Sequence, residues 1–311
     1  MHTILGAGGP ISNALERLLA KTSHSVRLVS RRPVAISGKT TWQKADLLNY
    51  NEVLKACEGS DVIYLCAGLK YNEAVWQEQW PKIMQNVINV TRETGARLIF
   101  FDNVYMYGLV KGPMTEETPY NPNSAKGEVR ARIATKLMDE AKAGNIRVSI
   151  ARAADFYGAT ETKNSFFDMM VLDNLLRKKT PQWLGNPNSL HSFTYVPDAA
   201  KGVFLLGQSC ESDNQIWHMP TASPLKGIDF INLAADAFNR PSKYTKINKL
   251  MLQLVGLFNP LIKSTVEMYY QYQHDYHFDS SKFEKAFNQN PVSYKAGITH
   301  LANTYYSHKN S

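Results

Sequence analysis

Residues 124–130 (SAKGEVR) place two cations, Lys126 and Arg130, four positions apart in a stretch with helical periodicity. Side chains at this spacing lie on one stripe of a helix. That stripe also carries three aliphatic residues, Val129, Ile133 and Leu137. The opposite stripe carries Glu128, Arg132, Thr135 and Asp139. Both cations are therefore expected on the inward face, where an unpaired charge is costly and an anionic or polar group should meet them.

These residue types predict acid–base chemistry. A lysine that is partly removed from water beside an arginine gives up its proton more readily, so Lys126 is a candidate general acid or base. Upstream, the side-chain amide of Asn103 could hold a carbonyl oxygen. Tyr105 could supply a phenol on the same side, if its strand extends that far. The alternative is that Lys126 only holds a bound ligand and no reaction takes place.

The elements that would position these side chains alternate between strand-like and helical patterns, which predicts an α/β fold with a doubly wound parallel sheet. The candidate strands lie at 2–5, 26–30, 61–67, 97–101 and 146–152. The candidate helices lie at 11–20, 49–57, 76–94 and 124–143. We expect residues 1–158 to form this domain.

The later chain, residues 159–311, is expected to form mainly a smaller α/β lobe for the substrate, covering the C-terminal edge of the sheet, where such sheets bind ligands. A helical stretch is expected near 165–178, and residues 193–220 are expected to return to the sheet. The most apolar run, 250–262, is too short to span a bilayer and is interrupted by a proline. It is interpreted as a helix packed within the lobe, with binding to a membrane surface as a minor alternative.

A glycine-rich turn at residues 6–12 (GAGGPIS) follows the first candidate strand and opens a helix. Glycines there let the backbone approach a pyrophosphate, which then lies at the helix N-terminus. The second strand ends in Arg31 and Arg32, where a site specific for NAD places an acidic residue. Because arginine pairs with a 2′-phosphate, NADP(H) is the predicted cofactor and NAD(H) the alternative.

With these motifs, the chain resembles an extended short-chain dehydrogenase/reductase of the NAD-dependent epimerase/dehydratase family. Asp46-Leu47 is similar to the family pair that contacts adenine, and Cys66-Ala67-Gly68 to the small-residue run that lines the cofactor. Segments 152–158 (RAADFYG) and 193–200 (FTYVPDAA) are similar to R-x-x-N-x-Y-G and F-x-x-V-x-D. The resemblance implies a Rossmann-type fold. The residues expected at the cofactor are Gly6, Gly8, Gly9, Pro10, Ile11, Arg31, Arg32, Asp46, Leu47, Cys66, Ala67, Gly68, Lys126 and Ala153.

The positions that depart from the family pattern are those that carry catalysis in the family. Asn103 stands at the position of the catalytic serine or threonine, while Lys126 and Arg130 stand at those of the Tyr-x-x-x-Lys pair. Some relatives without this tyrosine bind NADP(H) as sensors, and some plant phenylpropanoid reductases use a lysine for acid–base work. We expect Lys126 to exchange the proton, Arg130 to hold the ribose or tune charge, and Asn103 to polarise the carbonyl, with Tyr105 nearby.

Three functions follow from these expectations. The first is an NADP(H)-dependent oxidoreductase that acts on a small organic carbonyl or alcohol by hydride transfer. The second is a catalytically inactive NADP(H)-binding redox sensor with a protein partner. The third is a sugar-nucleotide epimerase or dehydratase, against which Arg31 and Arg32 argue.

Composition and charge limit the kinds of binding partner that are expected. The net charge of +8 is spread over the chain, its longest basic run is Arg177–Lys179, and no nucleic acid is expected as a partner. Three cysteines without paired spacing predict a reducing cytoplasm, and the early glycine turn leaves no room for a signal peptide. A small-molecule substrate is expected and no membrane; a homodimer is left open. The pair His274 and His277 lacks further ligands at metal spacing, so no metal is expected.

Overall fold

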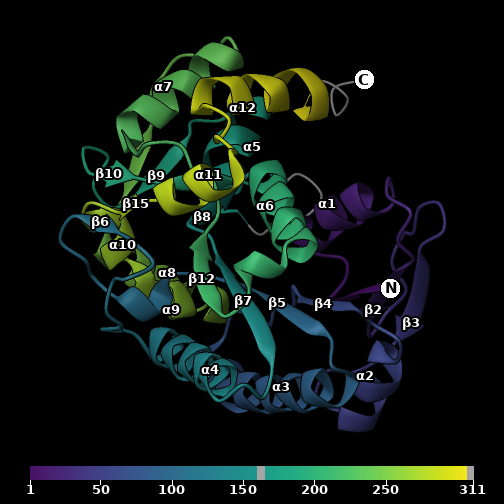
Figure 1. The fold of residues 1–311 in the computed structure, drawn as a ribbon. Coiled ribbons are helices and arrows are strands. Elements are labelled where there is room, and N and C mark those ends of the chain that lie inside the picture. The colour runs from purple at the N-terminus through teal and green to yellow at the C-terminus, as the bar shows by residue number, and fades with distance from the viewer. Residues whose placement is uncertain (160–164, 307–311) are drawn as a thin grey trace. The chain divides into compact units, whose positions relative to one another are not determined.

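The computed structural model describes residues 1–159 and 165–306 (Figure 1). Its main sheet has seven parallel strands in the order β12-β7-β5-β4-β1-β2-β3. The strands are β1 (His2–Leu5), β2 (Val26–Ser30), β3 (Thr41–Lys44), β4 (Val62–Leu65), β5 (Arg97–Asp102), β7 (Arg147–Arg152) and β12 (Gln215–His218). This order confirms the predicted Rossmann-type α/β fold.

Most of these strands are buried along their length, as expected for a parallel sheet covered on both faces. The sequence expectation did not include β3, whose residues TWQK are polar and partly exposed at the sheet edge. A polar edge strand has no apolar pattern from which it could be predicted.

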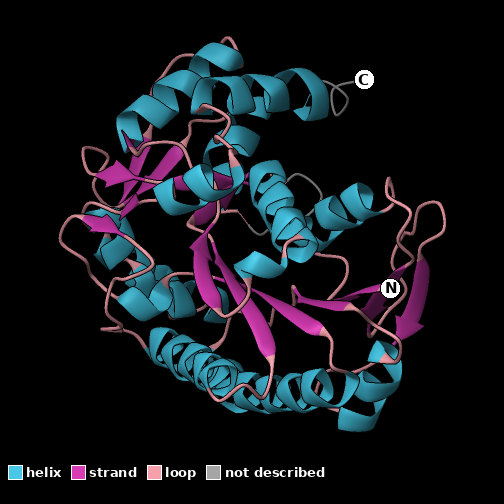
Figure 2. Ribbon diagram, in the orientation of Figure 1, coloured by secondary structure: helices cyan, strands magenta, loops and turns pink. Residues whose placement is uncertain are grey.

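Helices cover both faces of this sheet (Figure 1, Figure 2). The helices α2 (Tyr50–Cys57), α3 (Glu73–Thr94) and α4 (Ala125–Lys142) lie on one face, and α1 (Pro10–Leu19) and α6 (Val196–Gln208) on the other. Between the sheet and the first group lies a core of aliphatic and aromatic side chains that includes Trp80, Phe100 and Ile133. Apart from the small shifts expected at helix ends, the four helices predicted in this part of the chain are all present.

Contacts divide the chain into two compact units. The first comprises residues 1–108, 120–153 and 199–219 and holds the seven-stranded sheet. The second comprises 109–119 and the described parts of 154–198 and 220–311. The use of the second unit as a substrate lobe stays a prediction.

The second unit contains four short strand pairs and several helices. The pairs join β6 (Pro113–Met114) to β15 (His277–Phe278), β8 (Asp155–Tyr157) to β11 (Phe193–Tyr195), β9 (Gln182–Leu184) to β14 (Thr245–Ile247), and β10 (Leu190–His191) to β13 (Leu225–Lys226). The helices are a π-helical turn (Asp168–Leu172), α5 (Asp173–Leu176), α7 (Gly227–Ala237), α8 (Lys249–Gly256), α9 (Pro260–Thr265), a 3₁₀ turn (Val266–Met268), α10 (Tyr270–Gln273), α11 (Ser281–Phe287), α12 (Tyr294–Leu301) and a second π-helical turn (Ala302–Tyr306). Their core is rich in aromatic side chains such as Phe167, Phe193 and Phe230.

The apolar run at 250–262 differs from its prediction. It is not one helix but parts of α8 and α9, which are separated by residues 257–259, and Pro260 is the first residue of α9, a position that suits proline. Most of its large side chains are exposed, so its interpretation as a helix packed within the lobe is wrong for them. None of the described helices is long and apolar enough to cross a bilayer.

Candidate functional site

The glycine turn after β1 has a backbone that other residues would not tolerate. Gly6 and Gly8 have φ of +88° and +96°, in the left-handed region. A Cβ on Gly6 would lie 2.3 Å from Cα of Ala67, just after β4, and one on Gly8 would lie 3.1 Å from Cγ1 of Val34. The turn is therefore a tight cradle of backbone, as a pyrophosphate site needs.

The N-terminus of α1 follows this cradle directly. Gly9 is the N-cap and Pro10 the first helical residue. The hydroxyl of Ser12 accepts a hydrogen bond from N–H of Gly9 and donates one to its carbonyl oxygen, both at 2.9 Å. Ser12 is buried, so this side chain stabilises the helix start from inside. Ile11 is buried beside it and anchors the first turn.

The turn after β2 presents Arg31 and Arg32 to solvent. The hydroxyl of Ser30 donates to the carbonyl oxygen of Arg32 at 2.6 Å and accepts from Nε1 of Trp42 at 2.9 Å. The backbone that carries the two arginines is thus held in place while their guanidinium groups are available to an anion. This geometry agrees with, but does not test, a role at a 2′-phosphate.

The remaining cofactor candidates lie in the segments that follow β3, β4 and β7. Oδ1 of Asp46 accepts from N–H of Leu48 at 3.0 Å, and Leu47 packs against the core. Burial raises the pKa of the Cys66 thiol to about 12, which favours the protonated form over a nucleophilic thiolate. N–H of Ala153, after β7, donates to the carbonyl oxygen of Asp102 at 3.2 Å. Their cofactor contacts stay predictions.

Lys126 lies in the first turn of α4 and is fully buried. Its Nζ is 4.4 Å from the ring centroid of Tyr71, a cation–π distance. The Tyr71 hydroxyl in turn donates to that of Tyr105 at 3.4 Å. The structure therefore joins two sequence-predicted residues, Lys126 and Tyr105, through a tyrosine that sequence reasoning missed. An aromatic residue shortly after the small-residue run at 66–68 was the available signal.

Tyr105 lies in a turn after β5 rather than in the strand itself. β5 ends at Asp102, and Tyr105–Tyr107 form a 3₁₀ turn, so the condition that the strand extends to Tyr105 is not met. Oδ1 of Asn103 accepts from N–H of Tyr105 at 3.1 Å and stabilises this turn. That leaves the NH₂ group of Asn103 as the part able to hold a carbonyl oxygen. A Cβ on Gly127 would lie 2.5 Å from the carbonyl oxygen of Tyr105, so the glycine lets α4 approach the turn.

Arg130 meets a carboxylate that the sequence did not indicate. Its Nε lies 2.9 Å from Oδ1 of Asp102, and both side chains are buried. Its guanidinium carbon also lies 4.3 Å from the ring centroid of Trp80. Burial raises the pKa of the Asp102 carboxyl, and the neighbouring guanidinium groups of Arg130 and Arg152 oppose that rise. The expectation that an anionic group meets Arg130 holds, with the protein itself supplying one; its role at the ribose stays a prediction.

Asp102 belongs to a ladder of buried polar side chains across three strands. It lies in register with Arg152 on β7, which lies in register with His218 on β12. Nη1 of Arg152 donates to the hydroxyl of Tyr107 at 2.6 Å, and that hydroxyl is 2.8 Å from Nε2 of His218. The other Nη of Arg152 donates to the hydroxyl of Tyr120. The ladder lies at the carboxyl ends of the strands, the edge where open parallel sheets bind ligands.

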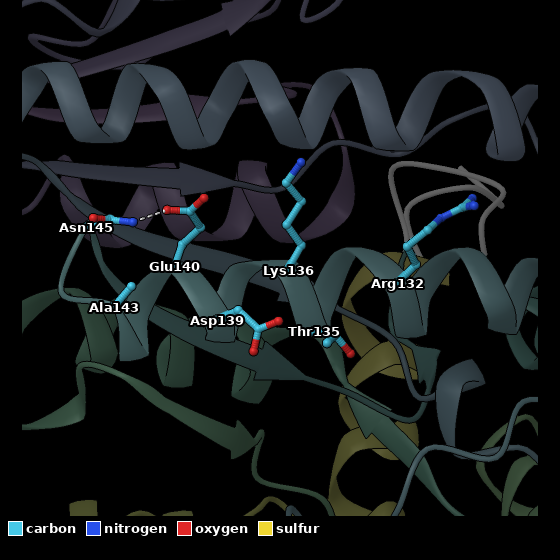
Figure 3. Close-up of a pocket in the computed structure, with 7 residues that line it drawn as sticks. All are labelled: Arg132, Thr135, Lys136, Asp139, Glu140, Ala143 and Asn145. Atoms are coloured by element: carbon cyan, nitrogen blue, oxygen red, sulfur yellow. Dashed lines mark hydrogen bonds between the residues drawn. The ribbon is translucent and has the colours of Figure 1, made fainter.

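The predicted stripes of α4 are confirmed. Lys126 and Arg130 are buried, with the three aliphatic residues of their stripe, and the polar stripe is exposed. A cavity of about 370 Å³ lies on the outer side of this helix (Figure 3). Its lining residues are Arg132, Thr135, Lys136, Asp139, Glu140, Ala143 and Asn145. None of them is a candidate site residue; Glu140 there accepts from Nδ2 of Asn145 at 2.7 Å.

The aromatic residues of the second unit pack against one another. His191 is buried between Tyr272 and Tyr276, at ring-centroid distances of 4.8 and 4.5 Å. Its Nε2 lies 3.2 Å from Oδ2 of Asp155, which also accepts from the Tyr272 hydroxyl at 2.6 Å. Trp183 is buried in the aromatic core. Among the described residues, no group of histidine, cysteine and acidic side chains is arranged to hold a metal ion.

Known structures share this fold over nearly the whole chain. A double mutant of the dTDP-glucose 4,6-dehydratase DesIV from Streptomyces venezuelae, with NAD and DAU bound, is 17% identical with a TM-score of 0.80, covering 100% of this chain and 98% of that one. MoeE5 in complex with UDP-glucose and NAD is 16% identical with a TM-score of 0.80, covering 100% and 99%. UDP-glucose 4-epimerase from Thermus thermophilus in complex with NAD is 14% identical with a TM-score of 0.78, covering 98% and 99%. At these identities the likeness shows the fold alone.

Sequence comparison gives the family. No curated protein matches the chain at a significant level. The model of the NAD dependent epimerase/dehydratase family matches residues 2–219, which include the glycine cradle, Lys126 and all seven strands of the sheet. This match supports the expectation of a nicotinamide-dependent enzyme and confirms the resemblance seen in the motifs. The chain belongs to the NAD dependent epimerase/dehydratase family.

Proposed function

We propose that this protein binds NADP(H) and interconverts a small organic carbonyl compound and its alcohol. The observation that carries this proposal is the cluster of Lys126, Tyr71 and Tyr105, three groups able to exchange protons, in a member of a nicotinamide-dependent family. When bound, a nicotinamide dinucleotide supplies hydride transfer to or from carbon. The protein must then hold the oxygen and move one proton.

The residues present fit such a cofactor. The cradle has no room for a Cβ at Gly6 and little at Gly8, and it leads into the N-terminus of α1, which favours a pyrophosphate. The exposed Arg31 and Arg32 stand where an adenosine ribose is held in this fold, and two guanidinium groups suit a 2′-phosphate. The three solved structures compared above contain NAD, whereas these arginines favour NADP(H) in this chain.

The chemistry is divided among three residues in the proposed mechanism. The NH₂ group of Asn103 holds the carbonyl oxygen, because its Oδ1 is already bonded within the 3₁₀ turn. Lys126 gives or takes the proton. Since Lys126 is fully buried beside the ring of Tyr71, that ring must shift before Lys126 can reach a substrate, or the proton must pass through a tyrosine hydroxyl. Both routes make Tyr71 part of the site.

Two other functions each have one supporting observation. The complete burial of Lys126 favours an NADP(H)-binding sensor that turns over no substrate. The likeness in fold to enzymes crystallised with UDP-glucose and NAD favours sugar-nucleotide epimerisation or dehydration. Arg31 and Arg32 argue against the latter, because that chemistry is expected with NAD and an acidic residue after β2.

The first test is a fluorescence titration with NADPH and with NADH. We expect NADPH to bind more tightly, and the double variant Arg31→Ala/Arg32→Ala to weaken NADPH binding on the order of 100-fold while leaving NADH nearly unchanged. The variant Arg132→Ala/Arg177→Ala removes two exposed arginines elsewhere and should bind both nucleotides as the wild type does. Equal wild-type affinities for NADPH and NADH would overturn the NADP(H) preference.

The second test is turnover. Oxidation of NADPH is followed with a panel of aldehydes and ketones, and UDP-glucose and dTDP-glucose are supplied separately with NAD. Consumption of NADPH with a carbonyl compound supports the proposal. Tight nucleotide binding without any turnover identifies a sensor, and conversion of a sugar nucleotide identifies the third function.

A further inference from the structure

The helical hairpin 249–265, made of α8, α9 and their connection, exposes an unusual number of apolar side chains. Eleven large hydrophobic residues are exposed in the described part of the chain, and seven of them lie between residues 250 and 261. These seven are Leu250, Met251, Leu254, Val255, Leu257, Phe258 and Leu261. Phe258, between the two helices, is 91% exposed. Single exposed apolar residues are ordinary, but a group of this size indicates a partner surface.

The hairpin is a formed structure rather than a loose segment. Oδ1 of Asn248 caps α8 by accepting from N–H of Met251, and Oδ1 of Asn259 caps α9 by accepting from N–H of Leu261 and of Ile262. A Cβ on Gly256 would lie 3.1 Å from Cα of Lys263, so the glycine lets the two helices pack closely. The apolar side chains therefore have defined positions.

Only a narrow face of the hairpin packs inward. Leu252 is buried in a small cluster with Leu184, Tyr269 and Tyr272, and Ile262 packs against this cluster. The wider apolar face points away from it. The spacing of the exposed residues on α8, at positions 250, 251, 254 and 255, is that of one continuous helical stripe.

The charged side chains of the hairpin and of the segment before it have one sign. Five cations lie within or just before the hairpin, and all five are exposed: Arg240, Lys243, Lys246, Lys249 and Lys263. No aspartate or glutamate occurs from residue 237 to residue 266. An apolar face within a stretch that carries five cations and no acidic residue is complementary to an anionic lipid surface, which offers both hydrocarbon and phosphate.

We infer that the hairpin 249–265 docks on the surface of an anionic lipid bilayer. Phe258 and Leu257 would enter the boundary between headgroups and acyl chains, and the lysines would lie at the level of the phosphates. A second copy of this chain is a poorer occupant, because it would bring two sets of five cations together. The sequence predicted no membrane partner and gave binding of this apolar run to a membrane surface only as a minor alternative; the inference adopts that alternative. It does not depend on the proposed redox activity.

The test uses the full chain and co-sedimentation with lipid vesicles. We expect binding to vesicles that contain phosphatidylglycerol in phosphatidylcholine and much weaker binding to phosphatidylcholine alone, with loss at high salt. The variant Lys246→Gln/Lys249→Gln/Lys263→Gln should lower partitioning onto the anionic vesicles about 100-fold. Its matched control, Lys39→Gln/Lys55→Gln/Lys111→Gln, removes the same net charge from exposed lysines elsewhere and should retain binding.

The apolar contribution is tested in the same assay. Leu257→Ser/Phe258→Ser should lower partitioning on the order of 100-fold, whereas Ile36→Ser/Leu109→Ser, which changes two exposed apolar residues outside the hairpin, should not. Thermal melting shows that each variant is folded. No binding to anionic vesicles, or equal binding by the hairpin variants and their controls, would overturn the inference. Wild-type self-association that Leu257→Ser/Phe258→Ser abolishes, without vesicle binding, would assign the surface to a second copy.

Discussion

Asp102, the last residue of β5, lies in register with Arg152, the last residue of β7. Oδ2 of Asp102 is 3.7 Å from Nε of Arg152, while its Oδ1 is 2.9 Å from Nε of Arg130 on α4. All three side chains are buried. One carboxylate therefore stands between two guanidinium groups that have little access to water, and its loss would leave both without this counter-charge.

The variant Asp102→Asn should consequently lower the free energy of unfolding by about 3 kcal/mol, because it leaves buried positive charge uncompensated. Urea denaturation measures the change. The matched control, Asp139→Asn, removes an exposed carboxylate on the outer stripe of α4 and should change stability by less than about 0.5 kcal/mol. Similar losses in the two variants would contradict a structural role for the Asp102 ion pairs.

Two glycines with similar φ, Gly112 and Gly6, allow the cost of backbone strain to be measured separately from the cost of a steric clash. Gly112→Ala places a Cβ at φ of +92° in open space and should cost about 1 kcal/mol in the free energy of unfolding. Gly6→Ala has a similar φ of +88°, but its Cβ would meet Ala67 Cα at 2.3 Å. It should cost at least about 2 kcal/mol more and weaken NADPH binding, because the cradle must open. Equal costs, with nucleotide binding intact, would show that the cradle is more adaptable than its geometry indicates.

The proposed chemistry depends on Lys126. Lys126→Met keeps most of the side-chain volume and should reduce turnover by at least about 100-fold, the size of a lost acid–base group. NADPH affinity, measured by fluorescence, should remain within a few-fold of wild type. Lys136→Met changes an exposed lysine of the same helix and should leave both quantities unaltered. Unchanged turnover in Lys126→Met would remove this lysine from the mechanism.

Asp168 should give the second unit a stability that depends on pH. Its carboxylate accepts from N–H of Gly158 and of Ala159 at 3.0 and 2.7 Å, and burial raises its pKa to about 6 from a usual value of 3.8. Between about pH 4 and pH 6 the folded state thus holds a proton that the unfolded state has released. Stability should rise as the pH falls through this window.

The difference in unfolding free energy between wild type and Asp168→Asn isolates that contribution. It should favour the wild type by about 2 kcal/mol more at pH 4.5 than at pH 7.5, since the variant has no such proton to bind. Asp229→Asn, an exposed carboxylate of the same unit, should show no such difference. If the unfolding free energy of Asp168→Asn changed with pH in parallel with that of the wild type, another group would be responsible for the pH dependence.

The sequence alone determined the parts that depend on local pattern. Runs of buried aliphatic residues define β1, β2, β4, β5 and β7, and the glycines at 6 and 8 mark a turn that only glycine adopts. The 3.6-residue period of α4 predicted that Lys126 and Arg130 face inward, which the structure confirms. Each of these features is set by near neighbours along the chain.

Tertiary structure decided which groups those inward side chains meet. Asp102, the partner of Arg130, lies 28 positions earlier in the chain, and Tyr71, the neighbour of Lys126, lies 55 positions earlier. The register between β5, β7 and β12 aligns Asp102, Arg152 and His218. Strand pairing and helix packing set these distances, and no local periodicity encodes them.

Tertiary structure also decided which apolar side chains are exposed to solvent. The apolar run at 250–262 has the composition of a core helix, yet Leu252 and Ile262 are its members that pack in the inward-facing cluster. Hydrophobicity measures what a side chain gains by leaving water, whereas the surrounding fold determines whether a partner surface within the chain is there to receive it. For the seven exposed apolar residues between 250 and 261, that surface is absent from the described part of this chain.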